Sequence, residues 1–362
     1  MRVAFRVDAS ISIGTGHVMR CLTLADELAC KGHECLFICR AHDGHLGDYI
    51  EAKGYSLTLL PGGNPVTSKA SNDYDSWLSV PWSVDAEQTI TSLKDGHYDW
   101  LVVDHYALDA QWEGSVAPFV GSIVAIDDLA NRPHYCDILL DQNLGRLAND
   151  YSDLLKGNTK CLIGPSYALL RPEFALQRND SLKRRSSPKL KRILVSLGGV
   201  DQNNMTGRVL SALALSELPK NSEVDIVMGA NSPYLSAVRQ QVQHLPYKAS
   251  VEINATNMAE RMYLADLSVG AAGSTTWERC CVGLPTLLIV LAANQQPLAK
   301  AVSDRGAAIC IDRDHITEEL IESVSKINLS TRVLKGLSRR SRDICDGLGR
   351  MRVASVMEEC IS

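Results

Sequence analysis

One histidine directly follows two closely spaced glycines in residues 8–25, DASISIGTGHVMRCLTLA. Gly14 and Gly16 permit a tight turn and a close approach of the backbone to a ligand. Apolar residues then recur at the i, i+3, i+4 and i+7 spacing of an amphipathic helix, so His17 should lie where unpaired helix N–H groups attract anions. An imidazole titrates near neutral pH and can accept a proton from water. His17, with Arg20 one turn further on, is therefore our candidate catalytic base.

A second candidate site lies in residues 270–278, GAAGSTTWE. A predicted strand ends here in small residues, which let backbone N–H groups approach a phosphate, and the hydroxyls of Ser274 and Thr275 can add hydrogen bonds. Glu278, about one turn into the next helix, can accept hydrogen bonds from a ribose diol. The alternative is a capping box, because Thr275 and Glu278 also fit the S/T-x-x-E pattern. A glycine pair at residues 198–199, which ends another predicted strand, favours the phosphate site.

The elements that must position these groups alternate along the chain. Uninterrupted apolar segments separated by helical patterns predict parallel sheets covered by helices on both faces. In the first half these segments are RVAFRV (2–7), HECLFICR (33–40), YSLTLL (55–60), WLVVDHY (100–106), SIVAIDD (122–128) and DILLDQN (137–143). Ligands of such sheets bind beyond the carboxyl ends of the strands. The polar residues expected there are Asp8, His17, Asp104, His105, Tyr106, Asp127, Asp128, Asp141 and Asn143.

The second half begins the same arrangement again. Residues 192–204, RILVSLGGVDQNN, read as a strand, a glycine pair and a polar turn, followed by a helix. Asn204 can cap that helix, and Asp201 or Asn203 would serve equally well. Further strand and helix patterns follow, and the last 50 or so residues read as helices. The fold class is therefore α/β, with two Rossmann-like domains.

We place the domain boundaries by composition. The first domain is predicted at residues 1–178, a polar, basic and proline-containing linker at 179–191, and the second domain at 192–362. The last helices are expected to pack back on the first domain. Residues 61–82 are rich in Gly, Pro, Ser and Asn, which predicts a long loop that covers the site as a flap.

Composition places this chain among ordinary globular proteins. It has 362 residues, 45% of them hydrophobic and 22% charged, and a formal net charge of −5, which gives no general attraction to nucleic acid or to an anionic membrane. No segment predicts a membrane span or a signal peptide, so we expect a cytoplasmic protein. We also expect a monomer, although no pattern in the sequence bears on the oligomeric state. The 11 cysteines are an odd number spread through predicted helices and strands, which favours reduced, buried thiols.

Two segments resemble cofactor-binding motifs, one for a dinucleotide and one for zinc, but neither matches its motif completely. A dinucleotide fingerprint would need a third glycine where Met19 stands, and an acidic residue where Arg40 ends the second predicted strand. Cys39, His42 and His45 are spaced like zinc ligands, with His33 nearby. An Asp-Gly turn interrupts them, and we expect surface histidines instead. We therefore predict neither a metal nor an organic cofactor.

Taken together, these segments resemble the UDP-sugar hydrolase family of pseudaminic acid biosynthesis. The N-terminal block resembles that family's signature R-x-D-x-S-x-x-I-G-x-G-H-x-x-R-C-L-x-L-A. Later blocks that resemble it are VVDHY (102–106), SLGGVDQNN (196–204), AAGSTTWERCCVGLP (271–285) and ANQ (293–295). The resemblance covers about residues 1–310. The third of these later blocks is also similar to glycosyltransferases of the lipid II-forming type.

The resemblance implies a glycosyltransferase-B-like fold with two parallel sheets facing across a cleft and UDP held mainly by the second domain. The implied reaction is hydrolysis of UDP-2,4-diacetamido-2,4,6-trideoxy-β-L-altropyranose at the C1–O bond, with inversion and without a metal. His17 matches the family's base, and Tyr106 and Asn294 match its sugar-cleft tyrosine and asparagine. The predicted substrate- and UDP-binding residues are Asp8, Gly14, Gly16, Arg20, Gly198, Gly199, Met258, Gly273, Ser274, Thr275, Glu278 and Gln295. A UDP-sugar glycosyltransferase and a non-catalytic nucleotide-sugar binding protein are the alternatives.

Overall fold

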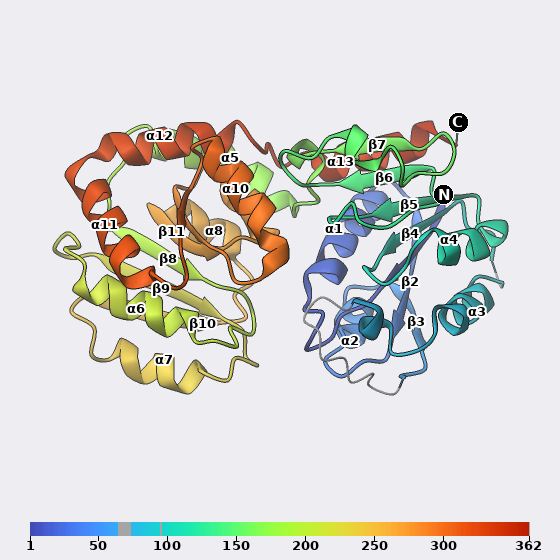
Figure 1. Ribbon diagram of the computed structural model, residues 1–362, viewed down its shortest axis with the longest axis horizontal. Helices are drawn as coiled ribbons and strands as arrows, with labels where there is room; N and C mark the ends of the chain where they lie inside the picture. The colour runs from blue at the N-terminus through green and yellow to red at the C-terminus, as the bar shows by residue number, and fades with distance from the viewer. Residues whose placement is uncertain (64–73, 95, 362) are drawn as a thin grey trace. The chain divides into compact units, whose positions relative to one another are not determined.

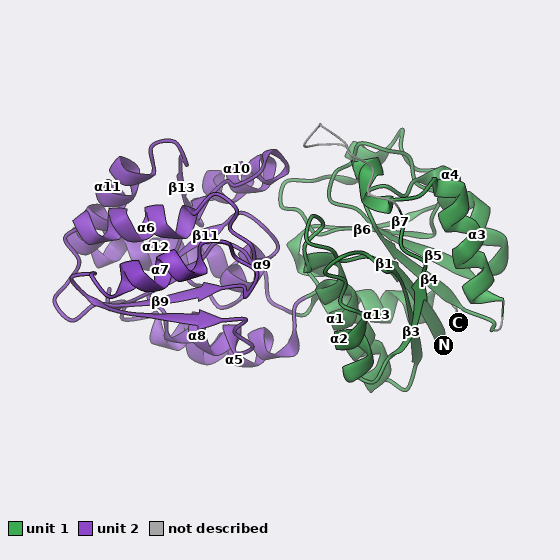
Figure 2. Ribbon diagram, turned by 90° about the horizontal axis from the view of Figure 1, so that it is seen from below, with its two compact units in different colours: residues 1–169, 348–362 green, residues 170–347 purple. Residues whose placement is uncertain are grey.

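The computed structural model describes residues 1–63, 74–94 and 96–361. The chain forms two compact units, one of residues 1–169 and 348–362 and the other of residues 170–347 (Figure 2). We call them unit 1 and unit 2. Each contains one sheet in which all strands are parallel, as the apolar segments predicted.

Unit 1 has a seven-stranded sheet in the order β3-β2-β1-β4-β5-β6-β7 (Figure 1). Its elements are β1 (Arg2–Val7), α1 (Gly16–Cys30), β2 (Glu34–Arg40), α2 (Gly47–Ala52), β3 (Ser56–Leu60), the 3-10 helix η1 (Tyr74–Leu78), α3 (Trp82–Leu93), β4 (Trp100–Asp104), α4 (Ala110–Val116), η2 (Ala117–Phe119), β5 (Ser122–Ile126), β6 (Ile138–Asp141), η3 (Ala148–Tyr151), β7 (Lys160–Ile163), η4 (Pro165–Tyr167) and α13 (Gly349–Glu359).

Side chains of this sheet alternate between two cores because successive strand residues point to opposite faces. Phe5 and Val102 pack with residues of α1 and α13 on one face. Ala4 and Leu101 pack with residues of α3 and α4 on the other. Both faces are therefore buried, and polar groups can reach a ligand only beyond the strand ends.

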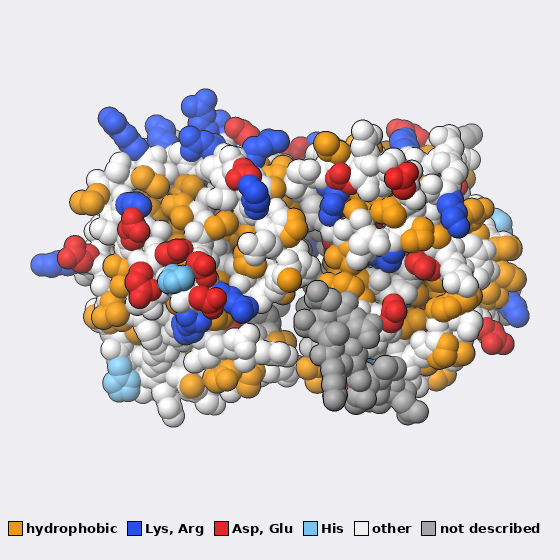
Figure 3. Space-filling view, viewed as in Figure 1, with side chains coloured by type: hydrophobic (Ala, Val, Ile, Leu, Met, Phe, Trp, Pro, Cys, Tyr) orange, Lys and Arg blue, Asp and Glu red, His pale blue; other side chains and the backbone are white. Residues whose placement is uncertain are grey.

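Unit 2 has a six-stranded sheet in the order β10-β9-β8-β11-β12-β13. Its elements are α5 (Pro172–Arg184), β8 (Arg192–Ser196), α6 (Met205–Leu215), β9 (Glu223–Met228), α7 (Leu235–Val242), β10 (Lys248–Ile253), α8 (Met258–Leu264), β11 (Leu267–Ala271), α9 (Thr275–Cys281), β12 (Thr286–Ile289), η5 (Ala293–Gln295), α10 (Gln296–Asp304), β13 (Ile309–Ile311), α11 (Ile316–Leu329) and α12 (Thr331–Arg342). Lys and Arg side chains gather on the solvent side of α12 (Figure 3), while Leu334, Leu337, Ser338 and Ser341 form its buried side.

The division between the units differs from the predicted linker at 179–191. The units divide between residues 169 and 170, and α5 occupies the first part of the predicted linker. The basic side chains there bind backbone carbonyls within unit 2, as Arg178 does at Cys281 and Arg185 does at Met262 and Ala265. Carbonyls at helix ends lack intrahelical partners and favour cations, so this basic segment is structural.

The chain's last segment and its long loop also bear on the predictions. Residues 348–362 lie in unit 1. Of the predicted flap at 61–82, residues 64–73 lie outside the described part, and η1 follows them. In the described ranges, no helix is both long and apolar enough to cross a membrane.

Candidate active site

The candidate base lies at the carboxyl edge of the unit 1 sheet. A tight turn leads into it, in which the Gly14 N–H donates to the Ser10 carbonyl at 2.8 Å. Gly14 has φ +81°, a left-handed conformation that glycine adopts without strain. Helix α1 then begins at Gly16, and His17 is its second residue.

Asp104, the last residue of β4, fixes the orientation of the His17 ring. Their Nδ1 and Oδ1 atoms are 2.7 Å apart. Burial opposes ionisation of Asp104, but Arg20 and His17 outweigh it and hold the pKa of this carboxyl well below its usual range. An ionised carboxylate only accepts hydrogen bonds, so Nδ1 carries the proton and the neutral ring has its lone pair on Nε2. Arg20 Nη2 also lies 3.3 Å from Nδ1, but both atoms are donors in this tautomer, so this contact is not a hydrogen bond. Among the described residues no hydrogen bond reaches Nε2, which leaves Nε2 for a water molecule.

Arg20 connects this pair to a second carboxylate. Its Nε and Nη2 donate to the two oxygens of Asp104 at 2.6 Å each, and its Nη1 lies 2.7 Å from Asp128 Oδ2. The Tyr106 hydroxyl donates to the same Asp128 oxygen at 2.7 Å. The Tyr106 ring meets the His17 ring edge-on, with centroids 4.7 Å apart. The structure thus brings together five side chains that the sequence singled out, His17, Arg20, Asp104, Tyr106 and Asp128, and it ties Arg20 to carboxylates rather than leaving it free for a phosphate.

Two aromatic residues that the sequence reasoning missed extend this wall. Trp77 stacks on Tyr106 with centroids 5.5 Å apart and an interplanar angle of 22°. Tyr74 contacts both rings edge-on. Both residues come from η1, in the described part of the predicted flap, so half-buried aromatic surface lies beside the candidate base.

Asp8 lies directly after β1, at the strand end where it was predicted, but its side chain does not face a ligand. It is fully buried and paired with Arg6 at 2.6 Å, and its Oδ1 also accepts the Arg40 N–H at 2.7 Å. Burial raises its pKa, but Arg6 and the other partners more than reverse this and keep the carboxylate ionised. A direct contact with substrate is therefore incompatible with this geometry. Asp8 instead belongs to a buried ion network beneath the site.

The zinc-like histidines are also more buried than predicted. The side chain of His42 is only 9% exposed, with its Nε2 3.4 Å from Asp8 Oδ2, and His33 bonds to Glu358 at 2.9 Å. The prediction of a surface position is therefore wrong for His42, whereas His33 pairs with a partly exposed glutamate. Over the described part of the chain, no group of three or more His, Cys, Asp or Glu residues has a geometry suited to a metal ion.

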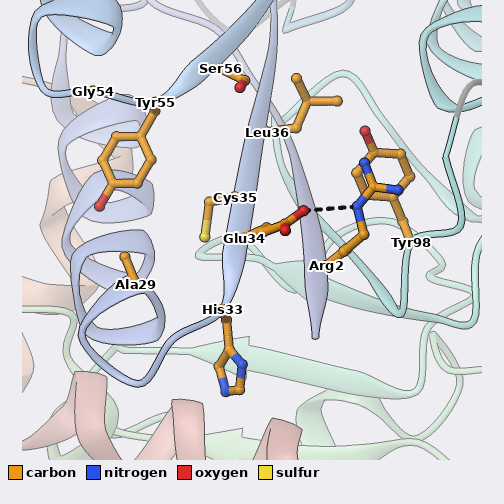
Figure 4. Close-up of a pocket in the computed structure, with 10 residues that line it drawn as sticks. All are labelled: Arg2, Ala29, His33, Glu34, Cys35, Leu36, Gly54, Tyr55, Ser56 and Tyr98. Atoms are coloured by element: carbon orange, nitrogen blue, oxygen red, sulfur yellow. Dashed lines mark hydrogen bonds and ion pairs between the residues drawn. The ribbon is translucent and has the colours of Figure 1, made fainter.

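A pocket of about 340 Å³ in unit 1 lies away from these groups (Figure 4). Arg2, Glu34 and Ser56, which line it, begin strands β1, β2 and β3, so it opens at the amino end of the parallel sheet. Asp104 and His17 are at the opposite, carboxyl edge. Arg2 and Glu34 pair with each other at 3.1 Å, so this pocket presents no free charge of theirs to a ligand.

In unit 2, the glycine pair lies after β8. Gly198 has φ +97°, and a Cβ on Gly229 would come within 2.0 Å of the Gly199 carbonyl, so the two loops need glycines to pack this closely. The helix after this loop is already capped. Asp201 accepts from the Met205 and Thr206 N–H groups at 2.8 Å each, and the Asn204 side chain accepts a further N–H. The N-terminus of α6 is thus occupied by side chains, which leaves the glycine backbone as the part suited to a phosphate.

The second glycine-rich loop leads from β11 into α9. Ser274 precedes the helix without a side-chain cap, so the alternative capping box of Thr275 and Glu278 is not formed. Glu278 instead lies 3.9 Å from Arg171. Burial raises the pKa of Glu278 to about 7, against the opposing effect of Arg171.

The remaining predicted residues are spread over the unit 2 sheet. Met258 is the first residue of α8 and is largely buried. Asn294 is exposed in η5, just beyond the carboxyl end of β12. The side chain of Gln295 accepts from the Leu291 N–H at 2.9 Å and closes that turn. The loops that follow β8, β11 and β12 therefore place Gly198, Gly199, Gly273, Ser274, Thr275 and Asn294 at one edge of the sheet.

Part of the chain is similar to a known protein family. Residues 192–347 match the description of the glycosyltransferase family 28 C-terminal domain. The matching segment includes both glycine-rich loops described above.

The chain as a whole resembles curated proteins, one of them a hydrolase. It is 27% identical over 307 residues to the UDP-2,4-diacetamido-2,4,6-trideoxy-beta-L-altropyranose hydrolase of Campylobacter jejuni, covering 84% of this chain and 97% of that protein. It is 31% identical over 207 residues to the spore coat polysaccharide biosynthesis protein SpsG of Bacillus subtilis, covering 57% of this chain and 60% of SpsG. The resemblance predicted from the sequence is confirmed.

Solved structures with low sequence identity share the fold. MurG of Acinetobacter baumannii superposes with a TM-score of 0.72 at 13% identity, covering 99% of each chain. The glycotransferase of kitacinnamycin gives a TM-score of 0.69 at 18% identity, covering 99% of this chain and 98% of its own. The predicted α/β fold with two Rossmann-like domains of the glycosyltransferase-B-like type is confirmed.

Proposed function

We propose that this protein hydrolyses UDP-2,4-diacetamido-2,4,6-trideoxy-β-L-altropyranose to the free sugar and UDP. The observation that carries the proposal is the His17–Asp104 pair at 2.7 Å, which directs the lone pair of the neutral imidazole to Nε2. The similarity to the Campylobacter jejuni hydrolase over nearly all of that protein supports the choice of substrate.

In the proposed reaction, His17 acts as general base. Nε2 takes one proton from a water molecule as the water oxygen bonds to C1 of the sugar, a step that typically contributes about 10²–10⁴-fold. The C1–O bond breaks, and its electron pair leaves with the UDP diphosphate. Attack from the face opposite UDP inverts C1. Asp104 stabilises the imidazolium that forms, and Tyr106 lies beside the ring, where a sugar can contact it.

Unit 2 would hold the UDP. The backbone of Gly198 and Gly199 and the loop from Gly273 to Thr275 offer N–H and hydroxyl donors to the diphosphate, which stabilise the charge gained on departure. Glu278 would accept hydrogen bonds from the ribose diol. Asn294 would contact the sugar, and Met258 and Gln295 would line the nucleotide site. The proposal involves no metal.

The family 28 domain also favours a second candidate, a UDP-sugar glycosyltransferase. Segments of 94 to 194 residues of this chain are similar to transferases. One of them is the UDP-N-acetylglucosamine--N-acetylmuramyl-(pentapeptide) pyrophosphoryl-undecaprenol N-acetylglucosamine transferase of Natranaerobius thermophilus, at 25% identity over 194 residues. In that case an acceptor hydroxyl would replace water. Supplying candidate acceptors distinguishes the two, because a transferase would form a glycoside in place of the free sugar.

The test is to incubate the protein with the altrose-configured UDP-sugar and a chelator and to follow the anomeric signals by NMR. We expect UDP and a free sugar whose first-formed anomer is inverted. His17→Ala should lose nearly all turnover and still bind UDP. Turnover by this variant at the wild-type rate would remove the proposed base, and release of no UDP by the wild-type protein would contradict the hydrolase.

A further inference from the structure

Arg279, a residue of α9 with no role so far, lies beneath the second glycine-rich loop. It is only 1% exposed. Its guanidinium reaches back to the start of its own helix, where Nη2 donates to the Ala271 carbonyl at 2.6 Å and to Thr276 Oγ1 at 3.0 Å, and Nη1 donates to Thr275 Oγ1 at 3.2 Å. The strand beside it leaves room for it, because a Cβ on Gly270 would come within 2.3 Å of Nη1.

In the described structure no carboxylate lies within ion-pair distance of this buried cation, and the neighbouring Glu278 raises its pKa only from a greater distance. The three acceptors of Arg279 are a carbonyl and two hydroxyl oxygens, and its Nε has no partner. Burial lowers the pKa of Arg279 to about 10, so the group is still charged at neutral pH. A buried charge without a counter-ion is unfavourable, and a bound anion nearby would offset this cost.

The contacts of Arg279 also decide how the two threonine hydroxyls are used. A hydroxyl has one proton to donate. Because Thr275 and Thr276 accept from Arg279, their own O–H protons point elsewhere. Thr275 is only partly buried and is the first residue of α9, beside Ser274, so its proton can be donated to a ligand at the loop.

We infer that Arg279 is a positioning residue for the diphosphate of a nucleoside diphosphate: it supplies the compensating positive charge from below the loop and holds the Thr275 hydroxyl as a donor to a phosphate oxygen. This inference rests on the proposed UDP site and adds a residue to it. It applies equally to a hydrolase and to a transferase, because both bind the same nucleotide.

Arg185 offers a matched control within unit 2. It is also buried, at 5% exposed, and its guanidinium likewise donates only to carbonyl and hydroxyl oxygens while its Nε has no partner among the described residues. Burial lowers its pKa to about 9. Its acceptors lie in α5 and at the end of α8, and none belongs to a glycine-rich loop. A purely structural effect of losing a buried guanidinium should therefore appear at either residue.

The test compares the affinities of UDP and uridine by isothermal titration calorimetry. Arg279→Met should weaken UDP binding by about 10- to 100-fold, the equivalent of losing a charge-assisted interaction, and change uridine binding less than about twofold. Arg279→Lys keeps the charge and should recover part of the loss. Arg185→Met should leave the ratio of UDP to uridine affinity as in the wild-type protein. As a single substitution, Thr275→Val should weaken UDP binding. Added to Arg279→Met, it should cause no further loss.

Several results would overturn the inference. One is an equal loss of UDP and uridine affinity in Arg279→Met, and another is a UDP-selective loss in Arg185→Met. Thermal denaturation shows whether Arg279→Met folds. If it does not, Arg279→Lys and Thr275→Val decide the question. The inference is contradicted if both of these variants bind UDP as tightly as the wild-type protein. A wild-type protein that binds no UDP would instead contradict the proposed function. Tight UDP binding that Arg279 variants retain would contradict only this inference.

Discussion

Replacing Asp104 by asparagine tests the reasoning about the base most directly. The carboxylate accepts one hydrogen bond from His17 and two from Arg20. An asparagine offers only one oxygen, so either orientation of the amide turns N–H groups toward a donor. In one orientation the amide favours the His17 tautomer that carries its proton on Nε2, and in both the negative charge that stabilises the imidazolium is gone.

The size of the effect follows from the separation of the charges. Nδ1 of His17 and the Asp104 oxygen are 2.7 Å apart, which places the two charge centres about 4 Å from each other. Unit charges at about 4 Å interact by about 4 kcal/mol at an effective dielectric constant of about 20. Since every 1.36 kcal/mol changes a rate about tenfold, we expect kcat to fall by about 10²- to 10³-fold.

The assay is release of UDP from the UDP-sugar under saturating substrate. UDP affinity, which we assign to unit 2, should stay within about twofold of the wild-type value. In a His17→Ala background, Asp104→Asn should cause no further loss, because its effect passes through His17. A folded Asp104→Asn protein that turns over within about threefold of the wild-type rate would refute the reasoning, and so would an additive loss in the double variant.

Other predictions concern buried charges. Because burial raises the pKa of Glu278 to about 7, uridine affinity should rise as the pH increases from about 6 to 8 and lose this dependence in Glu278→Gln, as calorimetry can measure; a pH-independent wild type would contradict the ribose contact. Burial also raises the pKa of Asp141 from 3.8 to about 6, so its contribution is most favourable below pH 4 and is lost as the pH rises through 6. We therefore expect the wild type to lose about 3 kcal/mol of stability relative to Asp141→Asn as the pH rises from about 4 to above 6, as measured by urea denaturation. If the stability of the two proteins depends on pH in the same way, this prediction is wrong. Asp85→Asn should lower stability by about 3–5 kcal/mol, because Asp85 is fully buried and accepts from Arg6 and Arg40; a change below 1 kcal/mol in the same assay would show that the network is dispensable.

Local patterns in the sequence were enough for most strands and for the helix that begins near His17, but β7 was not predicted. Uninterrupted apolar runs such as residues 100–104 gave the strands, because both faces of these sheets are buried. The spacing of two glycines before a histidine gave the start of α1, because that turn depends on neighbouring residues alone. These features are encoded within a few residues of each other.

The partners of the site residues could not be predicted in this way. Asp104 lies 87 residues from His17, and only the pairing of β1 with β4 brings them together. A polar residue at a strand end can face a ligand or be consumed within the protein. Asp8 and Asp104 are both fully buried, but Asp8 pairs with Arg6 beneath the site whereas Asp104 holds the candidate base, and nothing in their neighbouring residues distinguishes the two.

The long-range placement of charges also explains the difference at the linker. From the sequence alone, the basic side chains between residues 178 and 185 are expected to face solvent, because the sequence does not show which carbonyl groups they bind. Those acceptors are carbonyls at the ends of α8 and α9, about 80 to 100 residues further along the chain.

The return of α13 to unit 1 has a consequence for the order in which the protein assembles during translation. Val353, Ala354 and Met357 pack in the same core as β1 and α1, so that core is incomplete while only residues 1–169 have left the ribosome. All strands and helices of unit 2 are synthesised before α13. Translation of unit 1 thus begins before that of unit 2 and ends after it. Unit 2 has all of its core elements before α13, the last element of the unit 1 core, is synthesised.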